Sequence, residues 1–167
     1  MNKLSQWKKP IIAVAAFAVV CAIIHFFGFH IVSIRGTSMN QTLRTGDYAL
    51  VTKFDYLFGI DPHRGDITEC RFPDRSGTYI KRVIGLPGET IEITGGRLLI
   101  DGEPLSEPYV SSPTADYSVT LGEDEYLVLG DNRADSHDSR SADMGLLSED
   151  DFIGKVRFVI YPFRTIE

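Results

Sequence analysis

A serine in the polar part of this chain stands in surroundings that suit a nucleophile. Ser38 lies in the segment GTSMNQTL (residues 36–43), a few residues after a long apolar run. A serine hydroxyl is a poor nucleophile at neutral pH, so acyl-transfer chemistry at Ser38 requires a base elsewhere in the chain. The identity of that base is therefore the first question that the sequence must answer.

The four histidines are poor candidates for the base. Two of them lie in or beside the apolar run, and two stand in polar loops with no obvious carboxylate to orient them: His25, His30, His63 and His137. Lys81, in the segment YIKRVIGLPGE (residues 79–89), is the better candidate, because burial can lower the pKa of a lysine toward neutrality. Strand alternation would put Lys81 and Arg82 on opposite sides, so the pattern alone does not decide which of them faces the interior.

Composition limits the classes of function. The 167 residues, 43% hydrophobic and 24% charged, suffice for one modest domain with an appendage. Residues 1–9 carry a net charge of +3, which leaves −9 on the remainder of a chain whose total is −6. An acidic body argues against nucleic acid as a partner. The distant Cys21 and Cys70 are not expected to pair, and without CxxC or clustered histidines we expect no metal and no cofactor.

The apolar run, PIIAVAAFAVVCAIIHFFGF (residues 10–29), has no formal charge unless His25 is protonated. As a helix, the run is long enough to cross the hydrocarbon core of a bilayer, which is about 30 Å thick, so we predict a transmembrane anchor. The positive-inside tendency then places residues 1–9 in the cytoplasm and residues 30–167 outside it. A cleaved signal peptide is the alternative, but the run ends in bulky aromatic residues instead of a small-x-small site. Val20 also argues against a lipoprotein site at Cys21.

The remainder of the chain is predicted to be mainly β, because its apolar runs are short, β-branched or aromatic, and bounded by Gly, Pro and Asp. The pair Gly95-Gly96 predicts a two-residue hairpin. Residues 148–151 can cap one short helical turn, and residues 108–116 read as a surface loop. The predicted strands are residues 48–54, 67–71, 78–84, 90–94, 97–100, 117–121, 126–129 and 155–161.

Three stretches together resemble the bacterial type I signal peptidases, the membrane-anchored Ser-Lys proteases that remove signal peptides from exported proteins. They are GTSMNQTL, YIKRVIGLPGE and LGDNRADSHDSR (residues 129–140). With RGDI (residues 64–67) and GKV (residues 154–156) in the same order, the resemblance spans nearly the whole chain. It implies mixed antiparallel β sheets, in two sheet domains of which the second is small here, preceded by one N-terminal transmembrane helix.

The resemblance also implies roles for individual residues. Ser38 matches the nucleophile and Lys81 the general base, while Ser136 matches the serine that orients the lysine. Asp138 and Arg140 match a supporting ion pair. The substrate-binding residues that it implies are Ile34, Gly36, Met39, Tyr79 and Ile80. The expected partners are the signal peptides of exported preproteins and the lipid bilayer, with the catalytic domain at the outer face of the cytoplasmic membrane.

Two positions depart from the family pattern. Gln41 stands where the serine box usually has proline, and Gly36 stands where some members have a hydroxyl that contributes to the oxyanion hole. We therefore expect backbone N–H groups, including that of Ser38, to form the hole. If Gln41 keeps a proline-like backbone, Gln41→Pro should stabilise the domain by about 0.4–1 kcal/mol, and otherwise it should destabilise it.

Two other classes of protein remain open. A non-catalytic membrane factor that assists assembly of surface fibres (pili) would keep the fold and the anchor without requiring a working dyad. Self-cleaving repressors use a similar Ser-Lys pair but begin with a DNA-binding helix-turn-helix, whereas this chain begins with an apolar run.

Overall fold

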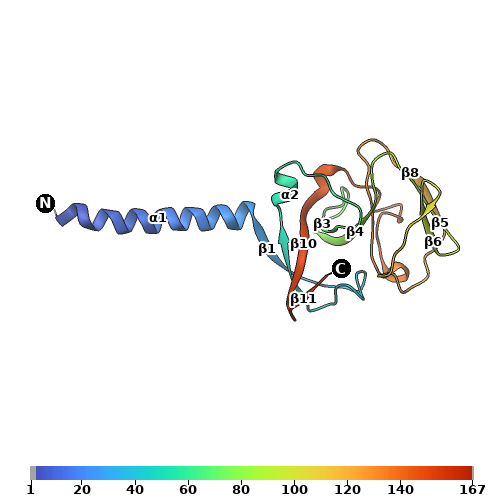
Figure 1. Cartoon of the computed structure of the whole chain (residues 1–167), viewed down its shortest axis with the longest axis horizontal. Coiled ribbons are helices and arrows are strands. Elements are labelled where there is room, and N and C mark those ends of the chain that lie inside the picture. The colour runs from blue at the N-terminus through green and yellow to red at the C-terminus, as the bar shows by residue number, and fades with distance from the viewer. Residues whose placement is uncertain (1–2, 167) are drawn as a thin grey trace.

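A long helix projects from a β-rich body in the computed structural model, which describes residues 3–166, apart from the side chains of residues 3–8 and 23–27 (Figure 1). The helix α1 spans Lys3–Phe27, and strand β1 (Phe29–Ser33) follows it directly. A short helix, α2 (Phe54–Leu57), comes after the second strand. All named strand pairs are antiparallel, which confirms the mainly β prediction.

No helix of the part that the structure describes is long and apolar enough to cross a membrane. The transmembrane span predicted over residues 10–29 is therefore not supported. Phe29, which the prediction placed in the span, is the first residue of β1.

The larger sheet carries the segments that the sequence analysis singled out. Its strand order is β1-β2-β10-β3-β4-β9, and β11 pairs with β10. The strands after β1 are β2 (Tyr48–Thr52), β3 (Ile67–Cys70), β4 (Tyr79–Gly85), β9 (Leu127–Leu129), β10 (Phe152–Tyr161) and β11 (Arg164–Thr165). Although two strands separate β1 from β3 in this order, His30 Nε2 on β1 lies 2.6 Å from Glu69 Oε2 on β3. The sheet therefore curls, and its first strand faces its middle.

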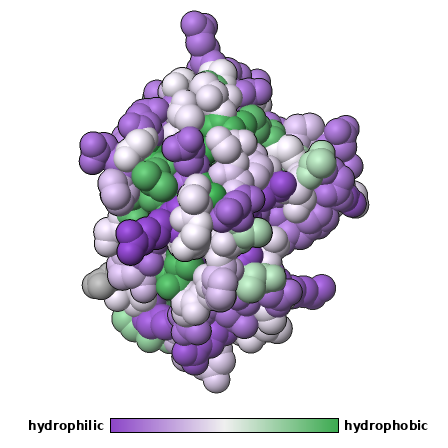
Figure 2. All heavy atoms as spheres, turned by 90° about the vertical axis from the view of Figure 1, so that its right-hand side faces the viewer, coloured by the Kyte–Doolittle hydropathy of each residue, from purple (hydrophilic) through white to green (hydrophobic). Residues whose placement is uncertain are grey.

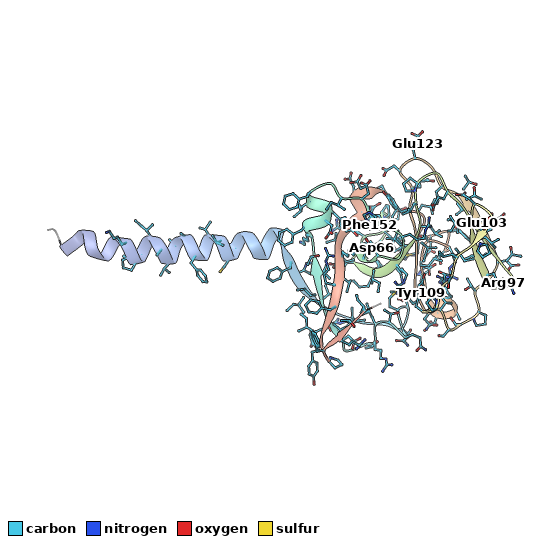
Figure 3. All side chains as sticks on the ribbon, in the orientation of Figure 1. Asp66, Arg97, Glu103, Tyr109, Glu123 and Phe152 are labelled. Atoms are coloured by element: carbon cyan, nitrogen blue, oxygen red, sulfur yellow. The ribbon has the colours of Figure 1, made fainter. Side chains whose placement is uncertain are left out.

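The smaller sheet lies at the end of the body farthest from α1 (Figure 1), where Arg97 and Glu103 extend outward (Figure 3). Its strand order is β7-β6-β5-β8, from β5 (Thr90–Thr94), β6 (Arg97–Ile100), β7 (Glu103–Pro104) and β8 (Tyr117–Thr120). The face seen from this end is mostly hydrophilic, with apolar patches between the polar residues (Figure 2). An apolar cluster that includes Leu127 and Leu129 of β9 joins this sheet to the larger one.

All the predicted strands are present, with ends that differ by at most a few residues. Gly95 and Gly96 form the predicted hairpin turn with φ angles of 56° and 79°, which glycine adopts without steric cost. The predicted helical turn is the 3-10 helix η2 (Glu149–Asp151), which the Ser148 and Asp151 side chains cap as a capping box. The prediction missed α2, the short strands β7 and β11, and β1, whose apolar residues continue the run before it.

Candidate active site

Ser38 lies in the segment between β1 and β2, and buried neighbours fix its position. Met39 and Leu43 are both buried in the core cluster under the curled sheet. The Leu43 N–H donates to the Met39 carbonyl at 2.7 Å, so the chain turns tightly just after the serine. The half-buried Ser38 side chain is thereby held at the edge of the core.

Lys81 reaches Ser38 from β4. Its Nζ lies 2.9 Å from Ser38 Oγ and 3.3 Å from Ser136 Oγ. Lys81 is only 3% exposed, and this burial lowers the pKa of its amine below the ordinary lysine value, although the nearby Asp138 carboxylate opposes the shift. The structure thus brings together Ser38, Lys81 and Ser136, which are far apart in the sequence, and favours a neutral amine between the two hydroxyls.

The segment of residues 130–140 attaches the serine loop to the lysine strand. The Asn132 N–H donates to the Ser38 carbonyl at 2.9 Å, and the Asn132 side-chain amide donates to the Thr37 carbonyl at 3.1 Å. A Cβ on Gly130 would lie 2.2 Å from Ser136 Oγ and 2.5 Å from the Ser38 carbonyl oxygen. Only glycine allows this close approach, so Gly130 is a positioning residue that the sequence analysis did not single out.

A buried ion pair stands behind the lysine, as the sequence analysis expected for Asp138 and Arg140. Arg140 Nε and Nη2 donate to the two oxygens of Asp138 at 2.8 and 2.9 Å, and the Gly130 N–H donates to Asp138 at 3.0 Å. Burial alone would raise the pKa of Asp138, but these hydrogen bonds outweigh it and lower that pKa. Asp138 is therefore ionised and paired with Arg140.

A second buried ion pair, between Arg82 and Asp131, lies beside the first. Arg82 Nε and Nη2 donate to Asp131 at 2.9 and 2.8 Å, and the Thr42 hydroxyl donates to the same carboxylate. The ring of Tyr109, from the loop of residues 108–116, covers the guanidinium, whose carbon lies 3.9 Å from the ring centroid. Arg82 thus has partners of its own, and it is Lys81 that extends toward the serine.

A cavity of about 280 Å³ opens beside the serine and the lysine. The expected substrate-binding residues all line it: Ile34, Gly36, Met39, Tyr79 and Ile80. Glu69 lines it too, and the sequence analysis missed this residue because β3 reads as an ordinary buried strand. A wider hollow of about 480 Å³, on a surface that includes Asp135 and His137, also borders Ser38 and Lys81.

The prediction that His137 has no carboxylate partner was wrong. His137 Nε2 lies 2.8 Å from Asp143 Oδ1, six residues further along the same loop region. The hydrogen bonds of the described residues nevertheless connect Ser38 Oγ with Lys81 and not with this histidine. Among the side chains that the structure describes, no cluster of three or more His, Cys, Asp or Glu residues has a geometry suited to a metal ion.

Comparison with known proteins decides the family. Residues 4–161 match the family model described as "Signal peptidase, peptidase S26". The chain belongs to the signal peptidase family. A signal peptidase I from Bacillus licheniformis is 36% identical to this chain, and the match covers 99% of this chain and 92% of the relative. A signal peptidase I from Leptolyngbya laminosa is 42% identical, and the match covers 77% of this chain and 67% of the relative. The crystal structure of a signal peptidase I from Enterococcus faecalis, 36% identical, superposes with a TM-score of 0.51 over 56% of this chain and 95% of that one.

The backbone at Gln41 differs from the one that a proline at this position would impose. Gln41 has a φ of 87°, whereas proline fixes φ near −65°. A proline-like backbone is therefore absent at this residue. Gln41 instead occupies the left-handed region that favours glycine, within two residues of the buried Met39.

We expect Gln41→Pro to destabilise the domain by more than about 1 kcal/mol and to slow cleavage, because proline cannot adopt the observed φ. Gln41→Gly is the matched control, and it should be neutral or stabilise the domain by up to about 1 kcal/mol, since glycine removes the strain of positive φ. Denaturant melts and initial rates on both variants measure the two effects. A proline variant that is as stable and active as the wild type would contradict the backbone conformation of this segment.

Proposed function

We propose that this chain is an endopeptidase that removes N-terminal signal peptides from exported preproteins, with Ser38 and Lys81 as its catalytic dyad. The observation that carries the proposal is the distance of 2.9 Å between Lys81 Nζ and Ser38 Oγ in a site where the lysine is buried. Membership of the signal peptidase family supplies the substrate class, and the geometry supplies a nucleophile and a base within hydrogen-bond reach.

The reaction follows from these two groups. Neutral Lys81 takes the hydroxyl proton as Ser38 Oγ attacks the scissile carbonyl, and then returns the proton to the leaving amine. This step leaves an acyl-enzyme on Ser38, which an attacking water clears with Lys81 again as the base. Ser136, at 3.3 Å from Nζ, orients the amine, and the Asp138–Arg140 ion pair holds the segment that carries Ser136.

A backbone N–H is available to stabilise the oxyanion. Among the described residues, no hydrogen bond uses the Ser38 N–H as donor, so this group is free to donate to the carbonyl oxygen as negative charge develops there. Gly36, with a φ of 93°, brings no side-chain hydroxyl to the hole. We therefore assign the Ser38 N–H to the oxyanion hole in place of a side-chain donor.

An extended substrate fits the cavity as an added strand. The cavity lies between the chain around residues 32–36 and the start of β4, so a substrate strand there would direct alternate side chains into it. Its volume of about 280 Å³, shared between two such side chains, favours small residues at the first and third positions before the cut. This is the small-x-small pattern expected of signal peptides.

The alternative, a non-catalytic factor for pilus assembly, does not account for the buried lysine. Burial of an ammonium group is costly unless the group is paired or loses its proton, and the Asp138 carboxylate is already paired with Arg140. A protein without chemistry at this site would gain stability from an apolar residue in place of Lys81. The peptidase is therefore the function that the site supports best.

We further propose that residues 10–29 anchor the protein in the cytoplasmic membrane with residues 1–9 inside and residues 30–167 outside. The basic N-terminus, the uncharged run and the acidic body support this orientation. External protease should digest the body of the protein in intact spheroplasts but not in inside-out vesicles. Recovery of the intact chain in the soluble fraction, or protection of the body in spheroplasts, would contradict the anchor.

Ser38→Ala and Lys81→Ala should each abolish cleavage of a preprotein and leave the thermal unfolding transition nearly unchanged. Lys81→Arg should also be inactive, because arginine stays protonated and cannot serve as the base. The measurement is appearance of mature protein from one purified preprotein, with Lys155→Arg as the matched control for the same exchange at a surface ion pair. An active Lys81→Arg enzyme would refute the dyad.

Cleavage should increase with pH through an ionisation well below the ordinary lysine pKa of about 10.4, because burial lowers the pKa of Lys81 and only its neutral form is a base. Activity is then lost as pH falls through that lowered pKa. Profiles of kcat/KM against pH for the wild type and for His63→Ala and His137→Ala test the assignment. If either histidine variant lost the acid limb, Lys81 would not be the titrating base.

A further inference from the structure

An acidic side chain, that of Glu69, lies in the wall of the cavity beside the dyad, which both apolar and polar residues line. Glu69 stands directly opposite Ile80 in the pairing of β3 with β4, one residue from Lys81, and its side chain is only 7% exposed. Val32 and Ile34 line the same cavity. Burial of a carboxylate is costly unless its oxygens accept hydrogen bonds, so the partner of each Glu69 oxygen matters.

One oxygen of Glu69 has a protein partner and the other does not. Glu69 Oε2 lies 2.6 Å from His30 Nε2, and the imidazole ring fixes the direction of the carboxylate. No residue of the described chain donates to Oε1. A carboxylate oxygen can accept from water or from a ligand, and here the space next to it is the cavity. Oε1 is therefore an unused acceptor on a residue that lines the cavity assigned to the substrate.

We propose that Glu69 is a specificity-determining residue that favours a hydroxyl side chain, serine or threonine, at the third substrate residue before the cut. The inference rests on the proposed function, because it takes the cavity as the substrate site. The side chain of the first residue before the cut lies next to Ser38 and Met39. The third residue extends on the same face about 7 Å further along the strand, toward Val32, Ile80 and Glu69.

The choice between threonine and valine at this position follows from desolvation. Both side chains have nearly the same shape, so both fit the same space. Valine would displace water from Oε1 and leave a buried acceptor without a donor, whereas the threonine hydroxyl replaces the lost hydrogen bond. A site built to hydrogen-bond a substrate hydroxyl discriminates strongly against the analogue that lacks it.

The test uses two preproteins that differ only in threonine or valine at the third position before the cut. For the wild type we expect kcat/KM to be at least about tenfold higher for the threonine substrate. Glu69→Leu, of similar size and suited to the apolar wall, should cleave both substrates with a ratio near one or below it. Glu69→Gln, which keeps an acceptor oxygen, should retain part of the preference.

Glu103→Leu is the matched control, since Glu103 is exposed on the smaller sheet at the far end of the molecule (Figure 3). Its ratio should equal that of the wild type. A wild-type ratio of one or below, or equal ratios in wild type and Glu69→Leu, would overturn the inference. A wild-type ratio of one or below is measured on the wild-type enzyme alone, so it does not depend on whether a variant folds. If the wild type cleaves neither preprotein, or if Ser38→Ala still cleaves them, it is the proposed function that fails.

Discussion

The site depends on keeping the amine of Lys81 neutral inside the protein. Burial disfavours the ammonium form, but a nearby carboxylate would restore it, and Asp138 is close enough to do so. Arg140 opposes this effect, because it pairs with Asp138 through two hydrogen bonds and its own positive charge lowers the pKa of Lys81. Desolvation then remains the dominant influence on the lysine. The acid and the arginine thus matter through the charge that they present to Lys81 as a pair.

The same segment that carries this ion pair also fixes the distance between Ser38 and Lys81. Residues 130–140 hold the serine loop through Asn132 and contact it closely at Gly130. They reach β4 through the buried pair of Asp131 with Arg82. Apolar side chains of β9, just before this segment, pack against the smaller sheet. The smaller sheet therefore supports the site without lining it, since it stabilises β9, the strand that leads into residues 130–140.

Curling of the larger sheet creates the cavity that we assign to the substrate. The contact between His30 and Glu69 joins β1 to β3 across the concave face, so the start of β4 and the chain before Ser38 become the two sides of one hollow. A flat sheet would keep these segments apart. The curl also brings the Glu69 carboxylate next to Val32, Ile34 and Ile80 in the cavity wall, an arrangement that only the tertiary structure creates.

The sequence by itself determined the strands of the β-rich body, the Gly95-Gly96 hairpin and the residues of the candidate dyad, because period-two patterns, turn residues and short motifs are local properties. It did not reveal β1, since Phe29 and the residues after it continue the apolar run and carry no boundary of their own. It also left open whether Lys81 or Arg82 faces the serine, because each side of β4 has one cation. The tertiary structure decided this through the partner that each cation meets: Arg82 meets Asp131, and Lys81 meets two hydroxyls. The place of Glu69 in the cavity was decided in the same way, because β3, β4 and the chain before Ser38 meet there only in the folded protein. The positive φ of Gln41 and the pairing of His137 with Asp143 are local, but no residue pattern in those loops specifies them.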